Sequence, residues 1–436
     1  MLIEQLQDWY LLPRGEEWWV LGVGMMTNVS CALIGCYLVM RRMSLMGDAI
    51  SHAVLPGLVV AFIFTGSLNI GGMILGAFAV GLLTTFLTQT LHRHGGVPAD
   101  ASMGVVFTSL FALGVVLLRR YAHNVDLDAD CVLQGVLSFV ANPKIEIWGL
   151  AIPRAAMSSG SVLLLNMLFI AVLWKELKIS SFDPELATTM GINATLLHYL
   201  LMAMVAATTV ASFEAVGSIL VIAMLIVPGA TAHLLTDRLK PMLIIAGAVG
   251  AISAYLGYLG TFWITEDAEP AGLMVCVSAV LFMLAVFFSP RYGIVSTLWR
   301  NLQTTSRIIR EDVLAMLYRL EELAVERLMG TGEAAQAVGG GLASRLAIWG
   351  LLRRGSIERT HGGLRLTEAG RRQAASLVRS HRLWEAYLVE FLGMPLDRVH
   401  APAARMEHYI GQELQQQIAA DLREGETDPH GREIPR

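Results

Sequence analysis

Long apolar segments constrain this chain more than any other feature of its sequence. A helix needs about 20 mainly apolar residues to cross a bilayer, and nine stretches before residue 290 approach that length. They are residues 18–40, 43–67, 70–91, 101–118, 161–174, 195–212, 214–235, 241–264 and 271–288. Because the stretch at 161–174 is short, we expect an all-α polytopic membrane protein with eight or nine transmembrane helices.

The distribution of charge divides the chain into two parts. Charged residues make up 16% of the 436 positions, well below the roughly 25% of soluble domains. After residue 290 the sequence becomes polar, with 20 Arg and 18 Asp or Glu. We therefore expect a transmembrane domain over 1–290, a linker over 291–306 and a soluble domain over 307–436. The near balance of charge in the soluble part does not by itself indicate a nucleic-acid partner.

Basic residues flank alternate gaps between the apolar stretches. They are Arg41, Arg42, Arg93, Lys175, Lys178, Arg238, Lys240 and Arg291. The positive-inside rule places these gaps in the cytoplasm, together with the soluble C-terminal domain. Arg119 and Arg120 depart from the pattern, so the path of residues 119–160 stays open.

The stretch Met43–Gly57 carries the most informative pair of polar residues. Asp48 and His52 are four positions apart, so on a helix they share one face. A carboxylate and an imidazole inside an apolar segment are costly unless they face a cavity and bind or relay something. Oxygen and nitrogen ligands of this kind suit Mn, Fe(II) or Zn. The alternative is structural: Asp48 caps the helix and His52 bonds to a neighbouring carbonyl.

A short polar segment between the fifth and sixth spans predicts a helix outside the membrane. Asp183 precedes Pro184, the pattern of an N-cap and a first helical residue, and Gly191 ends the segment. Such a helix would dock into another protein or serve as an ordinary loop helix. No lysine follows a glycine, so a phosphate-binding loop is missing. ATP hydrolysis would then belong to a separate chain, and this chain is not expected to be an enzyme.

Three stretches resemble the membrane permeases of manganese, zinc and iron ABC importers that work with a cluster-type metal-binding lipoprotein. They are Met43–Gly57, Phe182–Gly191 and Val216–Thr231, and the resemblance covers roughly residues 17–290. It implies that Asp48 and His52 line the ion path.

The same resemblance implies a set of partners. The coupling helix, seated in a separate ATP-binding subunit, would include Asp183, Pro184, Glu185 and Gly191. An extracytoplasmic metal-binding lipoprotein or periplasmic protein would deliver the ion, and a second permease subunit, identical or different, would complete the pathway. The location would be a bacterial plasma (inner) membrane, crossed several times.

The tail, over roughly residues 307–436, resembles the diphtheria-toxin-repressor-like metal-dependent regulators. The resemblance rests on Ser380–Glu385, Val399–His400, Met406–His408 and Asp428–Pro435. It implies one metal site at His381, Glu385 and His400 and a second at Asp312, Glu407 and His408. The family places a Cys or Glu ligand where this chain has Ala404, so the second site lacks one expected side chain. The structural alternative is a surface network of salt bridges and packed helices.

The tail also has the order of a winged helix. We expect helices around Val313–Leu320 and Leu342–Arg354, followed by a hairpin within Gly355–Gly370. The expected recognition helix carries Arg345, Arg353 and Arg354 together with four residues that we expect to pack, Leu346, Ile348, Trp349 and Leu351. DNA contact through this helix stays open, because the glycines at 339–341 are a poor helix start and the chain is tied to a membrane.

Together these patterns predict the permease subunit of an ABC importer for a divalent transition metal ion. A fused cytoplasmic winged-helix, helical metal-binding domain would report the internal ion and gate uptake. Manganese is favoured because carboxylate and imidazole groups dominate both sets of candidate ligands, while zinc and Fe(II) stay open. The ion would be substrate and regulator. The alternative function is a membrane-anchored, metal-dependent transcription regulator that binds DNA.

Overall fold

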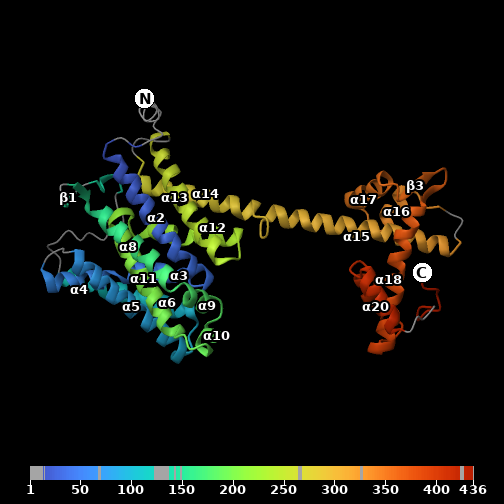
Figure 1. Ribbon diagram of the computed structural model, residues 1–436, viewed down its shortest axis with the longest axis horizontal. Helices are drawn as coiled ribbons and strands as arrows, with labels where there is room; N and C mark the ends of the chain where they lie inside the picture. Colours follow the sequence, from blue (N-terminus) through green and yellow to red (C-terminus); the bar gives the residue numbers. More distant parts are fainter. Residues whose placement is uncertain are drawn as a thin grey trace. The chain divides into compact units, whose positions relative to one another are not determined.

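The protein, described here from a computed structural model, divides into two compact units, Met1–Ser296 and Thr297–Arg436 (Figure 1). The structure describes residues 13, 15–66, 70–121, 137–141, 144–147, 150–263, 268–324, 328–422 and 427–435. Each unit has a hydrophobic core of its own.

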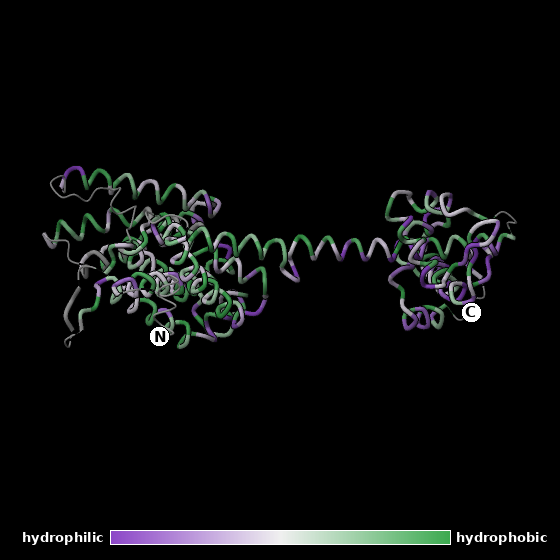
Figure 2. Tube along the Cα trace, turned by 90° about the horizontal axis from the view of Figure 1, so that it is seen from above, coloured by the Kyte–Doolittle hydropathy of each residue, from purple (hydrophilic) through white to green (hydrophobic). Residues whose placement is uncertain are grey.

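The first unit is a bundle of apolar helices. They are α2 (Glu17–Met40), α3 (Ser44–Ala53), α4 (Leu55–Thr65), α5 (Ile70–Gly95), α6 (Ala99–Tyr121), α8 (Arg154–Val172), α9 (Trp174–Phe182), α10 (Pro184–Thr189), α11 (Ala194–Val216), α12 (Ser218–Leu235), α13 (Leu239–Trp263) and α14 (Pro270–Phe288). Seven helices in the described part of the chain are long and apolar enough to cross a membrane: α2, α6, α8, α11, α12, α13 and α14. Hydrophobic residues run along most of this bundle in Figure 2. The unit is a multi-pass membrane domain, as the sequence predicts.

The expected span at 43–67 is not one continuous helix. α3 ends at Ala53 and α4 begins at Leu55, with Pro56 in its first turn. Pro56 has no N–H to donate to the carbonyl of residue 52, and its ring disfavours a continuous helix at this point. The short stretch near 161–174 is longer than expected, because α8 already begins at Arg154.

The open path of residues 119–160 contains a small hairpin in its described part. A 3-10 turn, η1 (Leu137–Phe139), precedes β1 (Lys144–Ile147) and β2 (Leu150–Pro153), which pair antiparallel. Residues 122–136 lie outside the described part. Helix α8 follows β2 directly.

Helix α2 packs mainly against α8, α11, α12 and α13. A glycine permits one close approach, since a Cβ on Gly35 would collide with the carbonyl of Leu225 on α12. A buried hydrogen bond joins α2 to α13, from Asn28 Nδ2 to Ser253 Oγ at 3.0 Å. Such bonds satisfy polar groups for which lipid offers no partner. Helices α2, α11 and α12 contact one another, and both α11 and α12 contact α3.

The second unit contains most of α15 and all later elements. They are α15 (Ile294–Glu322), α16 (Thr331–Ala337), α17 (Gly341–Arg353), β3 (Ile357–Thr360), β4 (Gly363–Leu366), α18 (Glu368–Leu392), α19 (His400–Met406) and α20 (Gln412–Asp421). The strands pair antiparallel, with Ile357 opposite Leu366. Helices α16 and α17 followed by this hairpin have the order of a winged helix. Residues 294–306 of the expected linker are helical and belong to α15.

Helix α17 packs with one face only. Ile348 and Leu351 are buried in a core shared with α15, α16 and the hairpin, as the sequence predicts. The prediction that Leu346 and Trp349 also pack is wrong, because their exposed fractions are 56% and 57%. Apolar residues occupy more than one face of this helix, so the sequence pattern did not reveal which face meets the core.

Candidate metal sites and coupling helix

Asp48 and His52 lie on α3, one helical turn apart. Their side chains fall outside the described part of the structure. The backbone of the helix that carries them is described. α3 contacts α5, α6, α11 and α12, and Ala49 and Ile50 on it are buried. The helix breaks within two residues of His52, and interrupted membrane helices are a common element of ion sites in transporters.

Helix α10 is the short helix that the sequence predicts after Asp183. The Oδ1 atom of Asp183 accepts the backbone N–H groups of Glu185 at 3.1 Å and Leu186 at 2.9 Å. Pro184 occupies the first helical position, where its missing N–H costs nothing. Gly191 follows with φ of 82°, a left-handed conformation that glycine adopts without strain.

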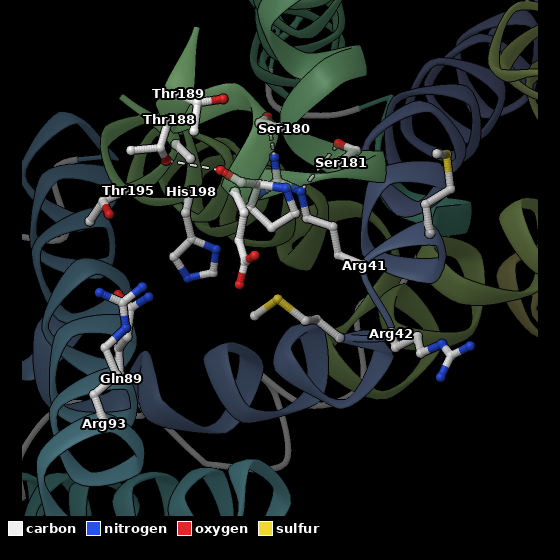
Figure 3. A pocket seen from close by; sticks show the side chains of 15 residues that line it. Arg41, Arg42, Gln89, Arg93, Ser180, Ser181, Thr188, Thr189, Thr195 and His198 are labelled. Carbon is white, nitrogen blue, oxygen red and sulfur yellow. Dashed lines mark hydrogen bonds between the residues drawn. The ribbon is translucent and has the colours of Figure 1, made fainter. Parts of the chain in front are cut away.

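A cavity of about 770 Å³ lies beside α10 (Figure 3). Its lining comes from the end of α2, the end of α5, the α9–α10 segment and the start of α11, and includes Arg93 and His198. Three arginines and one glutamate line it, so its charge is predominantly positive. Basic segments far apart in the sequence thus meet at one end of the bundle, which is what the positive-inside pattern requires of loops on one side of a membrane.

Arg41 connects the end of α2 to α9 at the wall of this cavity. Its Nη2 donates to Ser180 Oγ at 2.9 Å and its Nε donates to Ser181 Oγ at 3.2 Å, both on α9. Arg41 caps the end of α2, and α3 begins three residues later. Arg42, between them, has φ of 56°, an uncommon conformation for a non-glycine residue. A tight turn held by Arg41 therefore sets the position of α3 relative to α9.

The first cluster of histidine and carboxylate groups comprises His381, Glu385 and His400. His381 and Glu385 are one turn apart on α18, and His400 opens α19. His381 Nε2, Glu385 Oε1 and His400 Nδ1 lie 3.0 to 3.1 Å from one another. The His400 side chain is 66% exposed, so the cluster is open to solvent on its side.

The second cluster comprises Asp312, Glu407 and His408 and joins α15 to the residues after α19. His408 Nε2 lies 3.4 Å from Asp312 Oδ1 and 4.0 Å from Glu407 Oε1. On the other side of the ring, His408 Nδ1 lies 2.8 Å from Glu311 Oε2. A carboxylate that holds one ring nitrogen fixes the direction of the other, which here faces Asp312 and Glu407.

Glu407 belongs to the second cluster and also borders the first. Its Oε2 lies 2.5 Å from His381 Nδ1, and Arg319 Nη2 lies 3.6 Å from the same oxygen. His381 Nδ1 and Glu407 Oε2 are buried, and among the described residues neither atom has a hydrogen bond of good alignment. Buried polar atoms are normally satisfied, and at 2.5 Å the nearest partner of each of these two atoms is the other, with no room for a cation between them.

Burial argues against a purely superficial network of charges. His381, Glu385 and Glu407 are 2–4% exposed. In each cluster the possible ligand atoms of the three residues lie within 4.8 Å of one another. Ala404 lies on α19, four positions from His400 and four from His408, and it contributes no ligand atom. The carboxylate nearest His408 Nδ1 is instead that of Glu311.

The first cluster strongly favours an ionised carboxylate beside protonated histidine. Burial would raise the pKa of Glu385, but hydrogen bonds with His381 and His400 and their charge lower it to about 2. Burial would likewise lower the pKa of His381, yet the carboxylates of Glu385 and Glu407 raise it overall. A cation that enters must therefore displace a proton.

The second cluster behaves in the same way. Hydrogen bonds with Asp312 and Glu311 raise the pKa of His408 to about 9. His408 is then protonated at neutral pH, and the positive imidazolium balances the surrounding carboxylates. A cation that binds the His408 ring must therefore compete with a proton.

The sequence did not assign Glu311, Arg319 or Arg41 to these sites, although all three shape them. Glu311 is adjacent to Asp312, and Arg319 lies seven positions beyond it on the same face of α15. The position of each of these two residues relative to Asp312 could have been noticed in the sequence. Arg41 was recognised as a marker of membrane topology, but its bonds to Ser180 and Ser181 depend on tertiary packing.

The fold and these sites define a membrane transport permease that is fused to a domain of the metal-binding type. The chain belongs to the ABC 3 transport family, whose model matches residues 18–289. Residues 367–436 match a second family, the iron dependent repressor, metal binding and dimerisation domain. Both family resemblances inferred from the sequence are confirmed. Members of the first family are transport permeases rather than enzymes, and membership implies ATP-binding and substrate-binding partner proteins.

Individual relatives support the assignment over the length of the permease. The manganese transport system membrane protein MntD of Bacillus subtilis (strain 168) is 48% identical over 287 residues, which cover 66% of this chain and 96% of MntD. The zinc transport system membrane protein TroD of Treponema pallidum (strain Nichols) is 37% identical over 363 residues, 82% of this chain and 96% of TroD. The solved structure of PsaBC from Streptococcus pneumoniae in complex with Fab matches with a TM-score of 0.55 and 29% identity, covering 66% of this chain and 96% of that chain.

Proposed function

We propose that this chain is the permease subunit of an ABC importer for a divalent transition metal ion, and that its C-terminal domain senses the same ion in the cytoplasm. One observation carries the proposal: a chain of the ABC 3 transport family also holds two clusters of histidine and carboxylate groups in its repressor-type domain. Manganese is the favoured ion, because nitrogen and oxygen donors suit it and similar proteins are named as manganese transport proteins. Zinc and Fe(II) are the competitors.

We assign Asp48 and His52 to the ion path in the membrane domain. Their spacing of one turn on α3, the burial of Ala49 and Ile50 beside them and the helix break after Ala53 support this assignment. A carboxylate and an imidazole there replace part of the hydration shell of the ion within the apolar region.

Helix α10 is the segment that docks to the ATP-binding subunit. Apolar side chains recur every fourth residue around it, and the exposed fractions of Phe182, Leu186 and Met190 are 58%, 50% and 61%. An exposed apolar helix of this kind fits a groove on a partner. Movement of α10 reaches α9 and, through the two hydrogen bonds of Arg41, the turn that leads into α3.

In the C-terminal domain, the first and second clusters are the residues that would hold the sensed ion. Their donor atoms fit the same class of cation as the ion path, and a bound ion would supply the positive charge that protons now provide. The second cluster joins α15 to Glu407 and His408. Because α14 ends at Phe288 and α15 begins at Ile294, occupancy at Asp312 is linked covalently to the membrane domain through α15.

The remaining partners follow from the type of importer. An extracytoplasmic metal-binding lipoprotein or periplasmic protein delivers the ion, and a second permease subunit, identical or different, completes the pathway. The end of the bundle that carries α10 and the basic cavity faces the cytoplasm, in agreement with the positive-inside rule. The C-terminal domain follows on that side.

The test is uptake of radioactive manganese by proteoliposomes that contain the importer with its ATP-binding subunit. The Asp48→Ala, His52→Ala double variant should assemble and hydrolyse ATP but lose ATP-dependent uptake. Ser44→Ala, at the start of the same helix, is the matched control and should transport normally. Normal uptake by the double variant would overturn the assignment of the ion path, and competition by zinc and Fe(II) would rank the ions.

A further inference from the structure

Helix α17 presents an apolar face that the second unit does not cover. Leu342, Leu346 and Trp349 are spaced by four and three residues, so they share one face of the helix. Their exposed fractions are 75%, 56% and 57%. Three large apolar side chains on one short helix make a contiguous patch rather than scattered surface residues, and such a patch marks an interaction site.

The segment that carries this face is basic. Residues 341–366 contain five arginines, Arg345, Arg353, Arg354, Arg359 and Arg365, all of them exposed, and a single acidic residue, Glu358. The Arg353 guanidinium lies over the Trp349 ring, 5.1 Å from its centroid. The tail as a whole has nearly equal numbers of Arg and acidic residues. Residues 341–366 are therefore a basic segment within a nearly neutral tail, and a surface complementary to this segment is anionic.

The apolar residues disfavour base recognition in DNA as the purpose of this surface. A helix that reads bases in the major groove needs hydrogen-bond donors and acceptors directed at the base edges. The outward face of α17 instead presents two leucines and a tryptophan. Tryptophan and leucine with flanking arginines are the residues by which helices lie in the interface of an anionic bilayer.

The start of α15 also exposes apolar side chains. Ile294, Leu298, Trp299 and Leu302 are 53–63% exposed. Only five residues separate Ile294 from Phe288, the end of α14, and five extended residues span at most about 18 Å. The first turns of α15 are therefore held near the bilayer, and the second unit is tethered to it covalently, which raises its effective concentration at the lipid surface.

We infer that the face formed by Leu342, Leu346 and Trp349, with the arginines around it, binds the anionic headgroups of the bilayer in which the first unit is embedded. The three apolar side chains enter the interface and the arginines contact lipid phosphates. The winged-helix element thus serves as a membrane-surface module of the permease. This inference does not depend on which ion the permease carries.

The experiment uses the full chain in lipid nanodiscs, with a nitroxide spin label at Leu346→Cys in a background where the four native cysteines are replaced. A label at Gln412→Cys, exposed on α20, is the matched control. Nanodiscs contain either phosphatidylcholine alone or about one third phosphatidylglycerol. Accessibility to oxygen reports lipid, and accessibility to a water-soluble nickel complex reports solvent.

We expect the label at 346 to become accessible to oxygen and protected from nickel in the phosphatidylglycerol nanodiscs, and to lose this protection at high salt or with Arg345→Gln and Arg353→Gln. The label at 412 should stay accessible to nickel throughout. Three results would overturn the inference: nickel access at 346 in both lipids, protection from both reagents, which indicates a protein partner, or protection only when a DNA fragment is added.

Quenching of tryptophan fluorescence by brominated phosphatidylglycerol, compared between the native chain and Trp349→Tyr, repeats the test without cysteine replacement. It should detect a smaller quenched fraction in the variant, and equal quenching would contradict lipid contact at Trp349.

Discussion

His381 Nδ1 lies 2.5 Å from Glu407 Oε2, and this contact joins the two clusters of the C-terminal domain. The opposite ring nitrogen, Nε2, faces Glu385 and His400. One imidazole thus belongs to the first cluster through one nitrogen and borders the second cluster through the other. We expect the two clusters to bind ions as a coupled pair.

Removal of Glu407 should therefore weaken both clusters at once. We expect Glu407→Ala to lower the affinity for two equivalents of manganese, each by at least about tenfold. His400→Ala should lower the affinity for one equivalent only, because among the described residues His400 belongs to the first cluster and not to the second. Calorimetric titration of the purified protein distinguishes these outcomes. Loss of a single equivalent in Glu407→Ala would show that the clusters act independently.

The raised pKa of His408 predicts opposite effects of pH with and without metal. Its pKa is about 9 in the folded state because of Asp312 and Glu311, against about 6.5 in an unfolded chain. Its stabilising contribution is therefore complete below pH 6.5 and is lost as pH rises through 9. Metal affinity should rise over the same window, since fewer protons must be displaced.

Thermal unfolding of the C-terminal domain between pH 6.5 and 9, with and without manganese, measures both effects. The melting temperature should fall with pH in metal-free protein and should fall less, or rise, with manganese. His408→Gln is the control and should flatten both trends. A pH response of His408→Gln equal to that of the native protein would contradict the role of this ring.

Replacement of Arg41 should uncouple ATP hydrolysis from transport. Arg41→Ala removes two hydrogen bonds from a charged donor to Ser180 and Ser181, each worth about 1.5–3 kcal/mol. We expect hydrolysis to continue while the number of ions carried per ATP falls. Arg93→Ala, from the same cavity, is the matched control and should change this ratio less. An unchanged ratio in Arg41→Ala would exclude transmission through the turn before α3.

Arg382 predicts a large loss of stability in the C-terminal domain. Its buried guanidinium donates to both carboxylate oxygens of Glu322, at 3.0 and 2.5 Å, and so ties α18 to the end of α15. The same guanidinium lies 3.6 Å from the carboxylate of Asp428, which is 3% exposed, and a buried charge that loses its partner costs about 3–5 kcal/mol. Arg371, whose side chain is 46% exposed, pairs with Glu321, and Arg371→Ala should cost about 1 kcal/mol or less.

Denaturant unfolding of the two variants makes the comparison. The Arg382→Ala midpoint should fall well below that of Arg371→Ala. Equal midpoints would mean that the Arg382 pair contributes no more than an exposed one.

The sequence predicted the parts of the fold that depend on local pattern. Apolar length indicated the membrane helices, and Asp183 before Pro184 indicated the cap of α10. It failed where a single residue overrode the pattern: Pro56 divides the expected span at 43–67 into α3 and α4. Hydropathy sums over a window and does not detect a missing N–H.

The candidate sites show the same division. The resemblance to metal-dependent regulators implied a site at His381 and Glu385, and their spacing of four on a helix is a local property. The contact of Glu311 with His408 joins residues 97 positions apart, and the bonds of Arg41 span 139 and 140 positions. Such contacts arise from the packing of whole helices, so the identity of the residues alone did not reveal them.

The central claim is that the fused domain senses the ion that the permease imports. The most direct measurement is manganese uptake by proteoliposomes that display the C-terminal domain inside and are preloaded with increasing internal manganese. The account predicts that internal manganese inhibits uptake by the native importer and that His381→Ala, with transport otherwise intact, resists this inhibition. Equal inhibition of both proteins, or none in either, would contradict the account.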